Sequence, residues 1–358
     1  MAPYDVLLVG YGAVGVIYAY IMQRSELARV TVVARSNYEA AKNGHIVIES
    51  PTLGNSTSFK PYRVVQSVAE AADRPYKYVV ITTKALPDVL PTSKLLEPLL
   101  AKTYTHAQPT YALLQNGLGV EKDLYAKLSD RKPSTIPRVI TCAVYIVANT
   151  AGNTVLNPGE VPRLNMGFYT PSEGGVVSSA EAHQDLEGFA SLIQAGGGQA
   201  NVVDNVQAAK FNKNLANVML ATTSGLTRVP VPFWLATPDV WAKIHPLLVD
   251  IGHEVVAVAR ALGFVEQDVA SDSPETTLQY LLSLGFKADS KIKPSLLVDL
   301  EAGKSFELEV IIGEVLRASQ KAGLSTPLLE AGYTMLSVVQ AYILRNPELE
   351  STAMVNGR

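Results

Sequence analysis

The first fifteen residues hold the strongest structural signal in the chain. The apolar run Val6–Val9 predicts a buried parallel strand, and it leads directly into glycines spaced Gly-x-Gly-x-x-Gly. A proline-free stretch to about Met22 predicts a helix. In such a strand–turn–helix unit the glycines allow a tight turn, a close approach of the backbone to a pyrophosphate, and close helix–strand packing. The segment predicts dinucleotide binding, with an ordinary tight turn as the alternative. The predicted phosphate-binding residues are Gly10, Tyr11, Gly12, Ala13, Val14 and Gly15.

Composition excludes several classes of protein. The 358 residues are 47% hydrophobic and 18% charged, which predicts a globular chain of two domains. The net charge of −3 is spread along the chain, so we expect no nucleic acid partner.

A single cysteine, Cys142, lies in an apolar run and predicts a buried thiol. We expect no metal, because the histidines lack ligand spacing. With no signal peptide or bilayer-spanning stretch expected, we predict a cytoplasmic protein.

The order of predicted elements gives the fold class. Strands and helices alternate up to about residue 205, which predicts a Rossmann-type α/β domain with a parallel sheet over residues 1–205. Only helical patterns follow, which predicts an all-α domain over residues 206–358. The expected strands are 30–34, 78–82, 111–114, 138–147 and 200–203, with a proline-containing helix at 86–100 and a helix at 180–194. The expected C-terminal helices are 206–222, 239–262, 275–284, 295–302, 308–322 and 327–345.

Two pairs of short β-like runs do not fit simple alternation. Residues 45–49 and 62–65 flank a polar, turn-rich stretch, and we interpret them as a peripheral hairpin or excursion. Residues 154–156 and 163–167 predict an antiparallel edge of the sheet.

Arg35, at the end of the second strand, bears on cofactor choice. An acidic residue about 20 positions beyond the glycine motif would bind the ribose 2′-hydroxyl of NAD. This chain has Arg35 followed by Ser36, and a guanidinium can pair with a 2′-phosphate. We therefore predict NADP (NADPH), with a surface arginine as the alternative.

Two further strand ends carry polar side chains. Lys84 follows the strand at 78–82, and Asn116 follows the strand at 111–114. Ligands bind at the carboxyl ends of strands in open α/β sheets. We predict that Lys84 contacts the cofactor and that Asn116 lies near the nicotinamide, the alternatives being a solvated lysine and a turn asparagine.

The first helix of the C-terminal domain contains the sequence Lys210-Phe211-Asn212-Lys213-Asn214-Leu215-Ala216-Asn217. Lys213 and Asn217 are four residues apart and share one helix face. A lysine in this position could donate a proton to a carbonyl oxygen as hydride arrives at its carbon. A solvated polar face with two lysines is an equal alternative on spacing alone.

A second polar cluster lies near residue 300. Ser295 has the local sequence of a helix N-cap. Glu307 and Glu309 bracket Leu308, so one of the two carboxylates could point inward, although acids are also common in the first turn of a helix.

Together these elements resemble the ketopantoate reductase (2-dehydropantoate 2-reductase) family, and its fungal branch in particular. The shared elements are Gly10-x-Gly12-x-x-Gly15, Arg35, Thr83-Lys84, Gln115-Asn116-Gly117, Lys213-x-x-x-Asn217, Ser295 and Gly303-Lys304-x-x-Glu307, in the family's order. The resemblance covers nearly the whole chain. It implies a Rossmann domain followed by a helical domain, and NADPH-dependent reduction of a 2-oxo acid to a 2-hydroxy acid.

The resemblance also implies residue roles. Lys213 would be the general acid, and Asn116 and Asn217 would orient the substrate. Ser295 would hold the carboxylate or hydroxyl end of the substrate. Glu307 would contact the cofactor ribose and balance the charge of Lys213. The implied contacts with the adenosine end are Arg35 and Lys84, and Ala143 is an implied backbone contact. Lys213 is preferred to Lys210 because Phe211 precedes it by two residues, as in the family.

Departures from the family pattern leave the substrate open. Ala221 and Val231 stand where the family usually has asparagines, and Lys304 replaces an arginine. Pantothenate biosynthesis, with 2-dehydropantoate as substrate, is the expected role. The alternatives are a paralogue that reduces another 2-oxo acid, ketone or imine, and an NADP(H)-binding regulator without catalysis. Apolar residues in the helix Leu328–Leu344 suit either a core or a homodimer interface.

Overall fold

The structure, a computed structural model, describes residues 3–131, 136–171, 179–283, 285, 287–290 and 293–349. The chain divides into two compact units. Unit 1 comprises Met1–Ala85, Leu90–Gln115 and Val120–Gln207, and unit 2 comprises Leu86–Val89, Asn116–Gly119 and Ala208–Arg358. Two short segments from the first half of the chain therefore belong to the helical unit.

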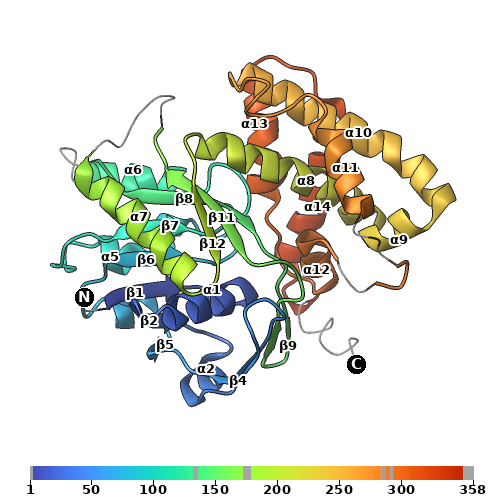
Figure 1. Ribbon diagram of the computed structural model, residues 1–358. Helices are drawn as coiled ribbons and strands as arrows, with labels where there is room; N and C mark the ends of the chain where they lie inside the picture. Colours follow the sequence, from blue (N-terminus) through green and yellow to red (C-terminus); the bar gives the residue numbers. More distant parts are fainter. Residues whose placement is uncertain are drawn as a thin grey trace. The chain divides into compact units, whose positions relative to one another are not determined.

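Unit 1 contains an eight-stranded sheet among the described residues, in the order β12-β11-β8-β7-β6-β1-β2-β5 (Figure 1). Neighbouring strands from β5 to β8 are parallel, β11 runs antiparallel to β8, and β12 is parallel to β11. The strands are β1 (Tyr4–Val9), β2 (Ala28–Val33), β5 (Arg63–Val65), β6 (Tyr78–Ile81), β7 (Thr110–Leu113), β8 (Val139–Tyr145), β11 (Arg163–Phe168) and β12 (Gln199–Val202). The central strands are apolar because helices cover both faces of the sheet.

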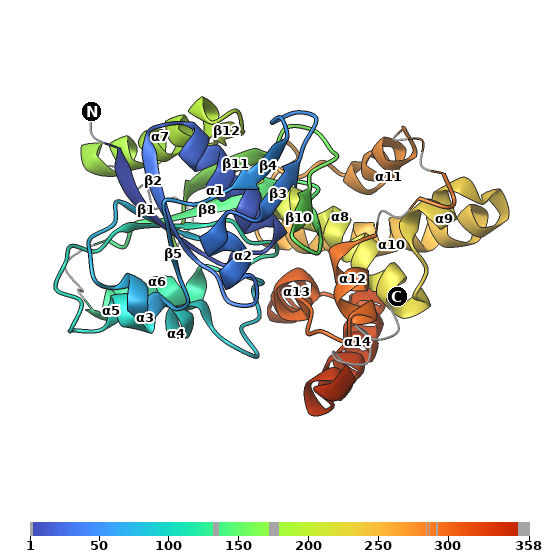
Figure 2. The same ribbon diagram turned by 90° about the horizontal axis from the view of Figure 1, so that it is seen from below.

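Helices of unit 1 lie on both sides of this sheet, as Figure 2 shows. The helices α1 (Ala13–Arg24) and α7 (Ala180–Ala195) contact each other on one face. The other face carries α3 (Val68–Ala71), α4 (Thr92–Leu95), α5 (Glu97–Leu100) and α6 (Lys122–Arg131), while α2 (Tyr38–Asn43) follows β2. The core between the sheet, α1 and α7 includes the predicted buried thiol, Cys142.

Three local expectations in unit 1 were wrong. The predicted helix at 86–100 is instead two four-residue helices, α4 and α5, with Pro91 before the first and Pro98 in the first turn of the second. Proline lacks an N–H and clashes with the preceding turn, so one continuous helix cannot form. The run at 62–65 is β5, an edge strand of the main sheet, and 154–156 is not an antiparallel edge of that sheet.

The run at 154–156 belongs to a second, four-stranded sheet of unit 1, in the order β4-β3-β10-β9. Its strands are β3 (Ile46–Glu49), β4 (Ser56–Phe59), β9 (Asn149–Ala151) and β10 (Thr154–Leu156). β3 forms an antiparallel hairpin with β4, which lies in the stretch expected to be turns, and not with the run at 62–65; β10 pairs in parallel with β3. A three-residue strand carries too little periodicity to identify its partner from sequence.

Unit 2 is helical. Its elements are α8 (Val206–Thr227), α9 (Val231–Ala236), α10 (Pro238–Ala261), α11 (Ser273–Ser283), α12 (Ser295–Glu301), the π-helix η1 (Glu309–Gly313), α13 (Glu314–Lys321) and α14 (Pro327–Arg345). The helix α10 contacts α9, α11, α13 and α14. The fold class is as predicted, an α/β sheet domain followed by helices. The sequence prediction missed α9 and the π-helix.

Two expectations for the C-terminal helices concern the apolar residues of α14 and the N-cap of α12. On α14, Leu329, Leu336 and Ile343 are buried, whereas Met335, Val338 and Tyr342 are exposed, so the helix is amphipathic. Ser295 is not the N-cap of α12, because that position is Pro294, whose extended backbone (φ −56°, ψ 143°) precedes the first turn. None of the helices in the described part of the chain is long and apolar enough to cross a membrane.

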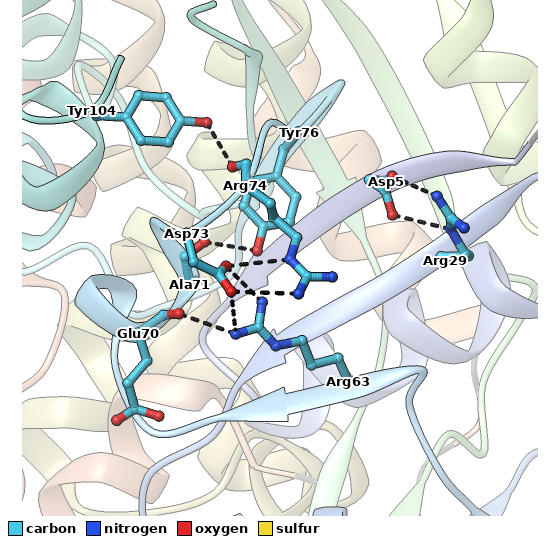
Figure 3. A network of polar contacts seen from close by, with 9 residues as sticks. All are labelled: Asp5, Arg29, Arg63, Glu70, Ala71, Asp73, Arg74, Tyr76 and Tyr104. Carbon is cyan, nitrogen blue, oxygen red and sulfur yellow. Dashed lines mark hydrogen bonds and ion pairs between the residues drawn. The ribbon is translucent and has the colours of Figure 1, made fainter. Parts of the chain in front are cut away.

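A polar network stabilises the amino ends of several strands of unit 1 (Figure 3). Arg63 of β5 pairs with Asp73 at 2.8 Å, and Arg74 pairs with the same carboxylate at 3.2 Å. Arg29 of β2 binds Asp5 of β1 at 2.7 Å. Parallel strands bind ligands at their carboxyl ends, so a network at the opposite edge indicates a structural role.

Candidate active site

The glycine turn has the geometry that its sequence predicts. Gly10 has φ +106°, and a Cβ there would lie 2.5 Å from the backbone nitrogen of Thr83. A Cβ on Gly15 would lie 2.0 Å from the Gly10 carbonyl oxygen. Both positions therefore require glycine. At Gly12, by contrast, an added Cβ would meet no atom within 4 Å, and no side chain caps α1, which begins at the next residue.

Two residues that the sequence analysis overlooked hold this turn. The hydroxyl of Thr82, directly after β6, donates to the Gly10 carbonyl oxygen at 2.6 Å. The amide of Asn37, just after β2, donates to the Tyr11 carbonyl oxygen at 2.6 Å. The Tyr11 side chain is buried, so only its backbone can face a ligand. Thr82 lies directly after β6, and Asn37 lies four residues after the end of β2, so their places near strand ends were the available signal.

The predicted adenosine-end residues also lie at strand ends of unit 1. Arg35 and Lys84 are exposed and follow β2 and β6. Among the described residues, the Arg35 side chain has no hydrogen bond or ion pair, so its guanidinium is available to an anion. Ala143 lies in β8 beyond Thr141, where the ladder between β7 and β8 ends. At Ala143 the edge of β8 on the β7 side is therefore beyond the paired residues, so a backbone contact with a ligand is possible there.

In unit 2, Lys213 and Asn217 are joined directly. Both side chains are half-buried on α8, and the Lys213 ammonium donates to the Asn217 Oδ1 at 3.2 Å. Burial lowers the pKa of Lys213 from 10.5 to about 8, and the negative charge of Glu307 limits that decrease. A lysine with this pKa is mostly an ammonium at neutral pH and can also release its proton easily, as a general acid requires.

Lys210, the competing lysine, has a different environment. It is 2% exposed and lies one helical turn before Asn214, which is 1% exposed. The Asn214 amide donates to the Ile311 carbonyl oxygen at 2.8 Å. Lys213, which is half-buried, is thus the more exposed of the two lysine residues.

The two glutamates that bracket Leu308 are distinguished by their surroundings. Glu307 is 4% exposed and acts electrostatically on Lys213. Glu309 is half-buried and accepts hydrogen bonds from Arg317 and from the Tyr333 hydroxyl, each at 2.7 Å. Glu307 is therefore the inward carboxylate, and Glu309 has a structural role.

The remaining predicted residues of unit 2 are placed as follows. Ser295 is exposed at the start of α12, and Lys304 is exposed beyond its end. Asn116 is half-buried in the loop that belongs to unit 2, next to Gly117 (φ +86°). In the described part of the chain, no three His, Cys, Asp or Glu side chains gather as a metal site would require.

Comparison with protein-family models decides the family. Residues 6–168 match the model described as Ketopantoate reductase PanE/ApbA, and residues 205–340 match Ketopantoate reductase PanE/ApbA C terminal. The chain belongs to the ketopantoate reductase family. It is accordingly an oxidoreductase of the ketopantoate reductase type.

Individual relatives of this ketopantoate reductase family member agree with that placement. An uncharacterised protein of Saccharomyces cerevisiae is 26% identical over 94% of this chain and 93% of its own length. The crystal structure of 2-dehydropantoate 2-reductase from Methylococcus capsulatus is 25% identical, with a TM-score of 0.73, over 95% of this chain and 97% of that chain. A D-mandelate dehydrogenase, solved with NADH and anilino(oxo)acetate, shares the fold at 15% identity and a TM-score of 0.73, over 95% and 99% of the two chains.

Proposed function

We propose that the protein reduces a 2-oxo acid to a 2-hydroxy acid with NADPH, with Lys213 as the general acid. The observation that carries this proposal is the Lys213 ammonium, which Asn217 holds at 3.2 Å and whose pKa is about 8. The proposed substrate is 2-dehydropantoate (ketopantoate), which would be reduced to pantoate in pantothenate biosynthesis.

The residues of unit 1 fit the proposed cofactor. The space beside Gly12 is open, and the uncapped N-terminus of α1 offers N–H groups to a pyrophosphate. The guanidinium of Arg35, which has no partner among the described residues, would bind the 2′-phosphate, with Lys84 beside the same end of the nucleotide. We assign Tyr11, Ala13 and Val14 backbone contacts with the phosphates. Ala143 is the proposed backbone contact farther along the sheet.

In the proposed reaction, the carbonyl carbon of the substrate would accept a hydride, which NADPH would supply when bound. Lys213 donates its proton to the carbonyl oxygen, which completes the new hydroxyl group and leaves a neutral amine. Solvent then protonates the amine again. Asn217 keeps the Lys213 ammonium oriented, and Glu307 keeps it charged until the proton is needed.

The other groups of unit 2 receive binding roles in this proposal. Asn116 and Asn217 carry amides that can both donate and accept, so they would orient the 2-oxo acid. Ser295, exposed at the start of α12, would hold the carboxylate or hydroxyl end of the substrate. Glu307 would also accept a hydrogen bond from the cofactor ribose.

A second candidate function differs only in substrate. Ala221 follows Lys213 and Asn217 at four-residue spacing on α8, so the three positions share a helix face. Ala221 and Val231 are both buried and apolar. Neither residue can pair with a substrate hydroxyl, and sites that pair such groups discriminate strongly against analogues. This favours a paralogue that reduces a 2-oxo acid with an apolar side chain, or a ketone or imine.

The test is oxidation of NADPH, followed by the absorbance of the reduced nicotinamide, with a panel of substrates. The panel contains ketopantoate, pyruvate, a branched 2-oxo acid and an aryl 2-oxo acid. The proposal predicts the highest kcat/KM for ketopantoate, and the second candidate predicts the highest value for an apolar substrate. If the protein binds NADPH but oxidises it with none of these substrates, the only remaining alternative is an NADP(H)-binding regulator without catalysis.

A further inference from the structure

The π-helix η1 begins directly after Glu307 and Leu308. Such helices are rare, occur mostly as single turns, and are found often at functional sites. In η1 two carbonyl oxygens accept hydrogen bonds from segments about 100 or more residues away in the sequence. The residues involved all belong to unit 2.

The first of these bonds comes from the loop that carries Asn116. The backbone N–H of Leu118 donates to the Val310 carbonyl oxygen at 2.7 Å. The contact is close, because a Cβ on Gly117 would lie 2.5 Å from Val310 Cγ2. Gly117 also has φ +86°, so only glycine suits this approach.

The second bond comes from α8. The Asn214 side-chain amide donates to the Ile311 carbonyl oxygen at 2.8 Å. Asn214 directly follows Lys213, Leu118 lies two residues after Asn116, and Glu307 lies two residues before η1. Each of these two long-range attachments to the π-helix is therefore within two residues of a group with a proposed role in the reaction.

We propose that Asn214 is a positioning residue, which fixes α8 on the π-helix and so sets the place of Lys213 relative to Glu307 and the Asn116 loop. The effect on catalysis that we infer rests on the proposed function. Asn214 itself does not touch the substrate in this account, because it is 1% exposed.

Packing alone does not explain this asparagine. Asn214 Oδ1 is buried and has no hydrogen-bond partner among the described residues. A buried acceptor without a partner destabilises the folded state, so an apolar side chain would stabilise the helix better. What an apolar side chain could not provide is the N–H group of the amide, which donates to the Ile311 carbonyl oxygen of η1.

The experiment compares Asn214→Ala and the milder Asn214→Ser with Thr223→Val. Thr223 is a matched control, because it is buried on the same helix and its hydroxyl donates to Met219 O within α8. The first readout needs no substrate. The rate of reductive methylation of Lys213 by formaldehyde and borane, measured against pH by peptide mass spectrometry, gives the pKa of that lysine.

The expected result is a Lys213 pKa of about 8 in the wild type and in Thr223→Val, and a higher pKa in both Asn214 variants. The rise follows because a displaced Lys213 becomes better hydrated. In turnover assays, kcat should fall roughly 10- to 100-fold in the Asn214 variants while KM changes little. Asn214→Gln, which keeps an amide donor, should recover part of that loss.

An unchanged Lys213 pKa in folded Asn214→Ser protein would overturn the inference, as would equal shifts in Thr223→Val. A wild-type protein that reduces no substrate of the panel would instead refute the proposed function. The methylation measurement would still decide the role of Asn214 in that case.

Discussion

At the scale of single residues, Lys213 is subject to two opposing effects. Burial disfavours its charged form, and the negative charge of Glu307 favours it. Burial has the larger effect, so the pKa falls to about 8. An ammonium that is charged at neutral pH, yet close to releasing its proton, is suited to general acid catalysis.

The pH dependence of kcat follows from this value. A general acid must be protonated, so kcat should be constant below about pH 8 and fall as the pH rises through the Lys213 pKa. The measurement is a pH–rate profile at saturating substrate and NADPH. A rate that stays constant well above that pH would show that Lys213 is not the proton donor.

Lys213 should also lower the stability of the free protein. Its folded-state pKa is below the unfolded value of about 10.4, so the unfolded state binds more protons between the two values. The cost is fully present below about pH 8 and is lost as the pH rises toward the unfolded value. Lys213→Met should therefore raise the free energy of unfolding by roughly 1–3 kcal/mol near pH 7, and by less near pH 10. Denaturant titrations at the two pH values check this, and a gain that does not depend on pH would contradict it.

Arg35 is the residue on which cofactor preference depends in this account. Its guanidinium has no hydrogen bond or ion pair in the described part of the chain, and it follows β2. Arg35→Ala should raise the KM for NADPH roughly 10- to 100-fold, as expected for the loss of a contact with a charged group. The KM for NADH should hardly change. Steady-state kinetics with both cofactors test this, and equal effects on the two would argue against a 2′-phosphate contact.

At the scale of elements, the sequence predicts best where the pattern is long and local. The apolar run before the glycine motif and the 3.6-residue periodicity of α8, α10 and α14 correctly predicted strand β1 and these three helices. The three-residue strands β5 and β10 were assigned to the wrong neighbours, because their pairing depends on distant segments.

In the candidate site, too, local patterns could be predicted from the sequence and long-range contacts could not. The spacing of Lys213 and Asn217 was visible in the sequence, and the structure joins the two side chains. The hydrogen bond from Asn214 to Ile311 spans 97 positions, and the bond from Leu118 to Val310 of the π-helix is also long-range. No local pattern in residues 309–313 distinguishes a π-helix from an α-helix.

The helix α7 is attached to the sheet by one buried carboxylate. Asp185 accepts hydrogen bonds from Lys77, from Arg138 at 2.7 Å and from Thr110 at 2.7 Å. Asp185→Ala removes the acceptor that these three groups share, while Lys77 and Arg138 stay partly exposed to solvent, so it should lower stability by about 1–3 kcal/mol. Asp73→Ala is the matched control, because that half-exposed carboxylate also binds two arginines and should matter by less than about 1 kcal/mol. Urea unfolding gives the free energy of unfolding of both variants. A similar decrease in the two would contradict the larger effect expected for the buried carboxylate.

At the scale of the whole molecule, the two units carry different parts of the proposed chemistry. Unit 1 contains the glycine turn and Arg35, the determinants proposed for the cofactor. Unit 2 contains Lys213, Asn217, Ser295 and Glu307, together with Asn116, which the chain contributes from its first half. The α/β segment thus provides the proposed nucleotide site, and the helical segment provides the groups proposed for proton transfer and substrate choice.

The most direct test of the central claim is turnover of 2-oxo acids with NADPH by the wild type, Lys213→Met and Lys210→Met. Folding and NADPH binding of each variant are checked first. We expect Lys213→Met to lose roughly 10²- to 10⁴-fold in kcat while it still binds NADPH, and Lys210→Met to lose far less. An equal loss in Lys210→Met, with folding intact, would contradict the assignment of Lys213 as the general acid.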